Sequence, residues 1–379
     1  MKKCIVCSDS FKGTVSSIDI CKFAKFVIPK FFPECELITI PMADGGEGSV
    51  DCVIEALGAE PVTVEVSGPY MEKIHATYAV YGDSAIIEMA SAAGLPLVKN
   101  HKNPLLTTTY GVGELILDAV NIGCRRIYLG LGGSSTNDAG CGCAAALGAE
   151  FFNHSGRSFV PTGATLSDIF SLDISKVKEK LEGIEMTVMC DVDNPMYGLN
   201  GAANVFGPQK GADAEMIKIL DAGLENFCKI VRQTLDIDLT FIPGSGAAGG
   251  MGGGAIALLG GTLCSGIEAI LSMTKFDQKL EGADLVITGE GRLDDQSFRG
   301  KVISGILSRT LRKEIPVFAI VGNVGTLTKD PIDYGISAVF ETNKEHRPMN
   351  EVEFTAARDY RAALEDAMRY QRILERHRI

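Results

Sequence analysis

Five segments of this 379-residue chain join glycine to acids and hydroxyls, and each follows a run of β-branched or other apolar residues. They are residues 8–13 (SDSFKG), 44–48 (DGGEG), 132–138 (GGSSTND), 191–194 (DVDN) and 289–295 (GEGRLDD). Backbone N–H groups of glycine-rich turns hold phosphate oxygens, and carboxylates hold Mg²⁺. Lysine or arginine offsets the charge of a transferred phosphoryl group. Together these residue types predict phosphoryl transfer.

The charged residues of these segments are the candidates for catalysis. We expect Asp191 to act as the general base or as a Mg²⁺ ligand. Asp44 and Glu290 are the next candidates for these two roles. Lys12 and Arg292 are expected to stabilise the transferring charge. The alternative for either cation is an ordinary surface or structural ion pair.

A stretch at residues 244–254 (GSGAAGGMGGG) contains the pattern G-x-G-x-x-G. In a dinucleotide-binding fold this pattern follows a strand, and an acid ends the next strand about twenty residues later. Glu268 has that spacing but lies in an expected helix, and Pro243 precedes the first glycine. We therefore expect a phosphate-binding loop that leads into a buried helix. The predicted phosphate-binding residues are Gly132, Gly133, Ser134, Ser135, Thr136, Asn137, Gly244, Gly246, Gly249 and Gly250.

Short strands alternate with helical patterns along most of the chain, which predicts an α/β fold with largely parallel strands. Residues 61–90 break this rhythm and read as several antiparallel strands joined by turns. The strands expected near residues 285 and 317 then resemble the N-terminal ones. We therefore predict one parallel-sheet domain from residues 1–65 and 285–379, and an inserted mixed α/β domain at 66–284. The active site is expected in the cleft between them.

Composition excludes several classes of protein. A net charge of -12 argues against nucleic-acid binding. Residues 239–267 carry no charge, but their glycines favour a buried loop and helix over a membrane span. No secretory leader precedes the eleven scattered cysteines, so reduced thiols and a cytoplasmic location are expected. Assembly into a homo-oligomer is left open.

Six longer motifs carry a resemblance to one family. DSFKG, PMADGGEG, LGLGGSSTNDAG, CDVDNP with GAANVFGPQKGA, GSGAAGGMGGG, and ITGEGRLDDQS with Gly300-Lys301 resemble the type I glycerate kinases of bacteria, in the order expected. Small departures occur at Ser135, Ala139 and Met196, and none removes a charged group.

The resemblance implies a flavodoxin-like domain, discontinuous in sequence, with a second α/β domain inserted. It also implies phosphorylation of D-glycerate with ATP and Mg²⁺, most simply to 2-phosphoglycerate and ADP. Glycerate and ATP would be the small-molecule partners. A kinase for another small hydroxy acid and a dinucleotide-dependent dehydrogenase are the alternatives.

Overall fold

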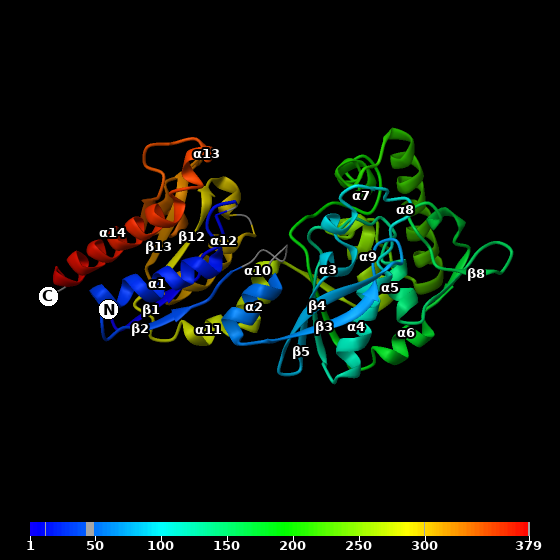
Figure 1. The fold of residues 1–379 in the computed structure, drawn as a ribbon, viewed down its shortest axis with the longest axis horizontal. Coiled ribbons are helices and arrows are strands. Elements are labelled where there is room, and N and C mark those ends of the chain that lie inside the picture. Colours follow the sequence, from blue (N-terminus) through cyan, green and yellow to red (C-terminus); the bar gives the residue numbers. More distant parts are fainter. Residues whose placement is uncertain (12, 43–48, 299, 378–379) are drawn as a thin grey trace. The chain divides into compact units, whose positions relative to one another are not determined.

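The computed structural model describes residues 1–11, 13–42, 49–298 and 300–377. The chain forms two compact units. The first unit comprises residues 1–44, 55–57 and 267–379, and the second comprises residues 45–54 and 58–266. Helix α2 (Ser49–Leu57) contributes residues to both. The two units are coloured along the sequence in Figure 1.

A parallel five-stranded sheet forms the centre of the first unit, with the order β14-β13-β12-β1-β2. Its strands are β1 (Lys3–Val6), β2 (Glu36–Thr39), β12 (Leu285–Leu293), β13 (Val317–Val324) and β14 (Ala338–Glu341). Numbered within the unit, this order is 2-1-3-4-5, the flavodoxin-like arrangement. The predicted parallel α/β fold is confirmed.

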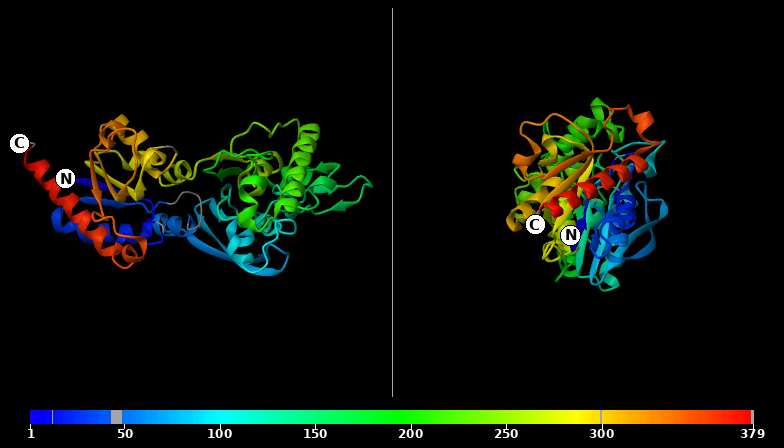
Figure 2. Two further views of the ribbon diagram at one scale, coloured as in Figure 1. Left: turned by 90° about the horizontal axis from the view of Figure 1, so that it is seen from above. Right: turned by 90° about the vertical axis from the view of Figure 1, so that its left-hand side faces the viewer.

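Two amphipathic helices, α1 (Ser17–Phe31) and α14 (Ala356–Arg376), pack on one face of this sheet and against each other. Figure 2 shows α14 lying along α1 from two further directions. Their apolar stripes, including Ile20 and Leu364, meet Val6 and Ile287 of the sheet in one buried core. The remaining helices of the unit are α10 (Gly266–Met273), α11 (Phe276–Lys279), α12 (Val302–Thr310) and α13 (Met349–Val352).

A six-stranded mixed sheet forms the centre of the second unit, with the order β11-β10-β6-β5-β4-β3. Its strands are β3 (Glu60–Ser67), β4 (Lys73–Tyr81), β5 (Ser84–Glu88), β6 (Arg126–Gly130), β10 (Glu185–Met189) and β11 (Thr262–Cys264). The pairs β3-β4 and β4-β5 are antiparallel, as predicted for residues 61–90, and the pairs beyond β5 are parallel.

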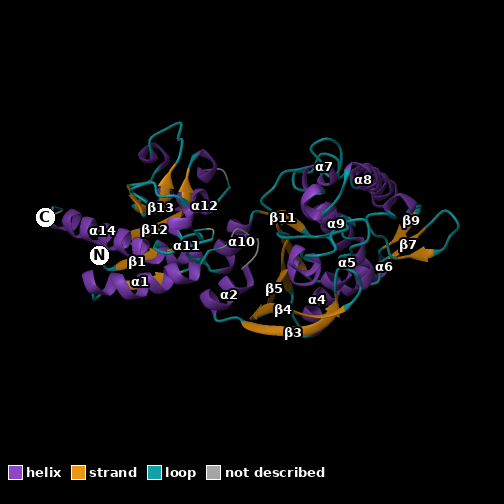
Figure 3. Ribbon diagram, turned by 45° about the horizontal axis from the view of Figure 1, so that its top comes forward, coloured by secondary structure: helices purple, strands orange, loops and turns teal. Residues whose placement is uncertain are grey.

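Helices and a small second sheet complete this unit, as the secondary-structure colouring of Figure 3 makes clear. The helices are α3 (Ala90–Ala93), α4 (Tyr110–Asn121), α5 (Cys141–Ala146), α6 (Ser175–Lys180), α7 (Ala202–Phe206), α8 (Ala214–Leu235) and α9 (Ala247–Leu259). The small antiparallel sheet contains β7 (Glu150–Phe152), β8 (Ser158–Phe159) and β9 (Ser171–Asp173). Helix α9 is buried along nearly its whole length.

The unit boundaries lie at residues 44 and 266, whereas the sequence suggested residues 65 and 285. The difference at the first boundary arises because β3 pairs along its whole length with β4. At the second, α10 packs on the helices of the parallel sheet: a Cβ atom at Gly305 of α12 would lie 2.6 Å from Ile267. In the described part of the chain, no helix combines the length and the apolar character needed to cross a membrane.

Candidate active site

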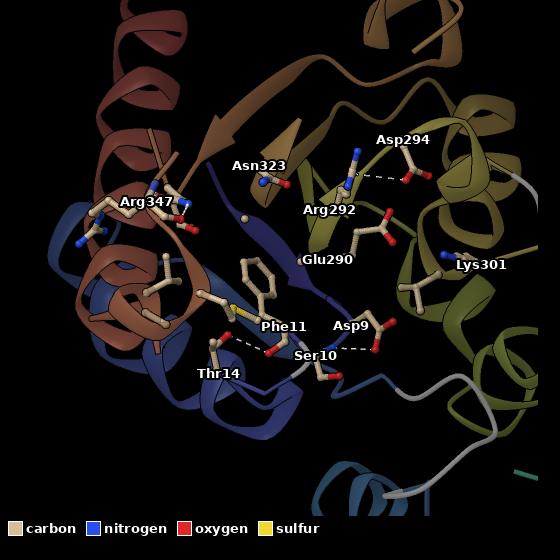
Figure 4. Close-up of a pocket in the computed structure, with 18 residues that line it drawn as sticks. Asp9, Ser10, Phe11, Thr14, Glu290, Arg292, Asp294, Lys301, Asn323 and Arg347 are labelled. Carbon is tan, nitrogen blue, oxygen red and sulfur yellow. Dashed lines mark hydrogen bonds and ion pairs between the residues drawn. The ribbon is translucent and has the colours of Figure 1, made fainter. Parts of the chain in front are cut away.

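A cavity of about 480 Å³ opens at the carboxyl edge of the parallel sheet in the first unit (Figure 4). Residues after β1, within β12 and β13, and after β14 line it, because the carboxyl ends of parallel strands meet at one edge. Polar lining residues from these strand ends include Asp9, Ser10, Glu290, Asn323 and Asn343. The geometry is that of a ligand site in an open α/β sheet.

Glu290 is the most deeply buried charged group of this cavity, with 8% of the residue exposed. Burial raises the pKa of its carboxyl group, and the neighbouring charges of Asp9 and Asp294 act in the same direction. Hydrogen bonding from Ser297 and the charge of Lys301 oppose this rise. Atom Oε1 has no hydrogen-bond partner among the described residues. A buried carboxylate oxygen left unpaired by the protein is suited to a cation or a ligand donor.

Two cations lie at the same end of the cavity as Glu290 (Figure 4). Arg292 is largely exposed, and its Nε lies 3.7 Å from Oδ2 of Asp294. Lys301 occupies the position just before α12 and is exposed. Because the Arg292 ion pair is long and exposed to solvent, it contributes little stability. Its guanidinium group can therefore turn to an anionic ligand at small cost.

The opposite side of the cavity contains Arg347 and an apolar wall. Arg347 forms an ion pair with Asp359, and its Nη1 donates to Oγ1 of Thr355 over 3.1 Å. Asn343 braces the same loop, since its Nδ2 donates to the Arg347 carbonyl oxygen. The wall consists of Phe11, Met349, Val352 and Ala356, whereas Val302 adjoins Lys301 at the other end of the cavity.

In the second unit, the structure brings together the loop at 132–137 and the glycine-rich segment at 244–254. The backbone N–H of Ala139 donates to the carbonyl oxygen of Gly249. A Cβ atom at Gly249 would lie 2.1 Å from the carbonyl oxygen of Thr136 and 2.6 Å from Cα of Asn137. Only glycine permits this approach, and φ of 70° also favours glycine there.

Helix α9 begins irregularly because of this contact. Ala248, Gly249 and Gly250 have φ of 54°, 70° and 88°, so the regular helix starts only after them. The element before the glycine-rich segment is helix α8 and not a strand. The G-x-G-x-x-G pattern therefore lacks the strand–turn–helix context of a dinucleotide fingerprint.

The loop at 132–137 is itself braced by its neighbours. The backbone N–H and the hydroxyl of Ser135 both donate to the carbonyl oxygen of Ala93, each over 2.9 Å. Thr136 Oγ1 and both amide atoms of Asn137 are buried and have no hydrogen-bond partner among the described residues. Gly132 and Gly133 are the accessible part of the loop. The loop therefore has buried polar atoms to which no described residue forms a hydrogen bond.

Lys210 lies directly against this loop and was not among the predicted residues. It is 2% exposed, and its Nζ donates to Oγ of Ser134 over 2.8 Å and to the carbonyl oxygen of Thr136 over 2.7 Å. Burial lowers the pKa of Lys210 to about 7, and the charge of Asp138 partly opposes this shift. Nothing in the local sequence FGPQKGA distinguishes a buried lysine from an exposed one.

Asp138 is fully buried and serves the fold. Its carboxylate accepts hydrogen bonds from the backbone N–H groups of Thr109, Gly140 and Gly142, and from the Thr109 hydroxyl. Burial raises the pKa of Asp138, and these hydrogen bonds act against the rise. One of these donors, Gly142, lies in the first turn of α5.

The remaining predicted residues are distributed over both units. Asp191 follows β10 in the second unit, is exposed, and accepts a hydrogen bond from the backbone N–H of Gly266. The backbone N–H of Gly246 donates to the carbonyl oxygen of Asn194, which brings the Asp191 segment against the glycine-rich segment. Lys12 and Asp44 lie outside the described residues.

Comparison with known proteins identifies the family. The model of the glycerate kinase family matches residues 4–372. A glycerate kinase of Bacillus cereus is 46% identical over 341 residues, which cover 89% of this chain and 90% of that protein. The glycerate 2-kinase of Escherichia coli K12 is 39% identical over 89% of this chain and 90% of that protein.

A solved structure agrees with the sequence matches. A crystal structure assigned as glycerate kinase 2 of Salmonella typhimurium LT2 superimposes with a TM-score of 0.87 at 35% identity, and covers 99% of both chains. The dehydrogenase alternative is therefore wrong, since the matched proteins are phosphotransferases. The chain belongs to the glycerate kinase family.

Proposed function

We propose that this enzyme phosphorylates D-glycerate with ATP in a Mg²⁺-dependent reaction and releases 2-phosphoglycerate and ADP. The observation that carries the proposal is the cavity of the first unit, where the buried carboxylate of Glu290 adjoins Arg292 and Lys301. Acids and cations at one strand edge are the groups that phosphoryl transfer needs. The name glycerate 2-kinase of the Escherichia coli relative supports the choice of product.

The donor set of Glu290 fits Mg²⁺. No group of three or more metal-ligating side chains is gathered closely enough to hold a metal in the described ranges. Mg²⁺, however, usually takes only one or two carboxylates and fills its other positions with waters and phosphate oxygens. The unpaired Oε1 of Glu290 is available for this purpose. We propose Glu290 as a ligand of this ion, with Asp44 and Asp191 as the further candidates; bound Mg²⁺ would neutralise charge on the phosphate groups.

The other residues are assigned by their charge and position. Where Asp191 is not a metal ligand, it is the proposed general base that accepts the proton of the attacking hydroxyl group, as a carboxylate does in other kinases. Lys12 and Arg292 stabilise negative charge on the transferred group. The ATP phosphates lie against two glycine-containing loops, through Gly132, Gly133, Ser134, Ser135, Thr136, Asn137, Gly244, Gly246, Gly249 and Gly250.

The direct test is an ATP-consumption assay with D-glycerate and Mg²⁺, with the phosphorylated product identified by NMR. Formation of 2-phosphoglycerate supports the proposal, and formation of 3-phosphoglycerate would overturn its regiochemistry. A panel of other short hydroxy acids serves as the comparison. A higher kcat/KM for another acid would replace glycerate as the substrate and leave the phosphotransfer chemistry in place.

A further inference from the structure

A buried lysine without a contacting carboxylate is unusual in a folded protein. Nζ of Lys210 has two acceptors, the Ser134 hydroxyl and the Thr136 carbonyl oxygen, and both are neutral. Within the described ranges, Lys210 forms no ion pair with a carboxylate. Buried charges are normally paired or neutralised.

The charged groups around Lys210 do not supply that pairing. The charge of Asp138 acts on Lys210, but the two carboxylate oxygens of Asp138 already accept hydrogen bonds from the backbone N–H groups of Thr109, Gly140 and Gly142. On the other side, Lys102 packs on Gly211, and its Nζ donates to the carbonyl oxygen of Gln209. The positive charge of Lys102 cannot neutralise that of Lys210. An ammonium group at Lys210 therefore needs an anion from elsewhere.

Unused polar atoms lie on the same loop that Lys210 contacts. Thr136 Oγ1, Asn137 Oδ1 and Asn137 Nδ2 are three of the eight buried side-chain polar atoms that have no partner in the described part of the chain. Thr136 and Asn137 are both 0% exposed. An unsatisfied buried polar group destabilises the fold, so several are retained at one place chiefly where a ligand or water completes their hydrogen bonds.

We propose that Lys210, Thr136 and Asn137 form the inner part of an anion-binding site, and that Lys210 takes up a proton when an anionic group of a substrate binds. The anion is either a phosphate of ATP or the carboxylate of glycerate. This inference rests on the proposed function for the identity of the substrates. The proposed assignment of the loop at 132–137 to phosphate makes ATP the first ligand to examine.

Binding of an anion beside Lys210 is expected to weaken as pH rises. Burial lowers the pKa of free Lys210 to about 7, so at pH 8 roughly a tenth of the molecules carry the charge. A ligand that requires the charged form binds in proportion to that fraction. Its apparent Kd is therefore expected to rise about tenfold between pH 6 and pH 8, with uptake of roughly one proton per ligand at pH 8.

The test is isothermal titration calorimetry at pH 6, 7 and 8, in two buffers of different ionisation enthalpy, which reports proton uptake separately from affinity. MgADP and D-glycerate are titrated separately, so that no turnover occurs and the two sources of the anion are distinguished. The variants are Lys210→Arg, which keeps the charge at every pH, and Lys210→Met. Lys102→Met is the matched control, because this exposed lysine lies beside the same segment.

We expect wild type and Lys102→Met to take up roughly one proton at pH 8 with one of the two ligands. Lys210→Arg should bind that ligand without uptake and with a Kd that changes less than about twofold between pH 6 and pH 8. If Lys210→Arg takes up the same number of protons as wild type, or wild type shows no uptake with either ligand, the proposal is wrong. Absence of proton uptake by wild type overturns the proposal even if both variants fail to fold.

These outcomes are separate from those of the activity assay. If ATP and glycerate react as proposed but no proton is taken up on binding, the function stands and the role of Lys210 does not. If MgADP and D-glycerate both fail to bind while another hydroxy acid is phosphorylated, the substrate assignment fails. Proton uptake is then measured on binding of that acid to wild type and to Lys210→Arg. Uptake by wild type alone supports the role of Lys210, and equal uptake or none overturns it.

Discussion

Replacement of Gly249 by alanine is expected to destabilise the second unit strongly. A methyl group there would place Cβ 2.1 Å from the Thr136 carbonyl oxygen and 2.6 Å from Cα of Asn137, so two backbone segments must separate. Overpacking of this kind costs about 1–3 kcal/mol, and the left-handed φ of 70° adds about 1–2 kcal/mol for alanine. The expected loss is roughly 2–5 kcal/mol.

The matched control is Gly260→Ala at the other end of the same helix. Gly260 has φ of 69°, but a Cβ atom there would meet nothing within 4 Å. Only the conformational cost of about 1–2 kcal/mol applies. The difference between the two variants therefore measures the close approach of the glycine-rich segment to the loop at 132–137.

Thermal unfolding followed by circular dichroism is the measurement. For a unit of this size each kcal/mol lowers Tm by about 2–4 °C, so Gly249→Ala should lose roughly 4–20 °C and Gly260→Ala roughly 2–8 °C. KM for ATP should also rise in Gly249→Ala, because the displaced loop is the proposed phosphate site. Equal Tm losses in the two variants would refute the argument that contact, and not φ, selects glycine at position 249.

Three further results are expected. Glu290→Gln should lower kcat by about 100-fold or more without lowering Tm at pH 7. Burial raises the pKa of the Glu290 carboxyl, so this group stabilises the fold below the usual glutamate pKa and loses that contribution as pH rises through the raised pKa. The Glu290→Gln variant should therefore be at least as stable as wild type at pH 7. The difference in stability should vanish at low pH, where the carboxyl group of wild type is protonated. A marked fall in Tm at pH 7 would contradict this. Asp191→Asn should lower kcat by about 10²–10⁴-fold with an unchanged Tm, because asparagine still accepts from the Gly266 N–H; near-normal turnover would remove Asp191 from catalysis. Chelation by EDTA should abolish turnover and added Mg²⁺ restore it, whereas activity that survives chelation would exclude the proposed metal dependence.

Much of the fold could be predicted because its signals are local. Apolar β-branched runs such as residues 285–288 and 317–321 form buried parallel strands. The motif positions after these strands follow from chain direction alone, since parallel strands bring their carboxyl ends to one edge. At this edge, Glu290 and Arg292 both line the cavity of the first unit.

Other features escaped prediction because they depend on distant contacts. The boundary near residue 44 was placed too late because β3 has the same residue pattern whichever sheet it joins. Alanine favours the right-handed helix, so the residue type does not predict the left-handed conformation of Ala248. That conformation accompanies the close approach of the next residue, Gly249, to the backbone of Thr136. The roles of Arg347 and Asn343 at the cavity likewise required the packing of a loop after β14.

Fold class and the residue types of the candidate site could be predicted from periodicity and from the residues that follow each strand, which are properties of neighbouring residues. The order of six motifs carried the resemblance to the glycerate kinase family. Which of those residues are buried depends on the folded structure, and burial shifts their protonation. Burial disfavours the charged forms of the Glu290 carboxyl and the Lys210 ammonium group, and the surrounding charges and hydrogen bonds do not fully offset this. Such desolvation depends on every segment packed around a group and not on its neighbours in the chain.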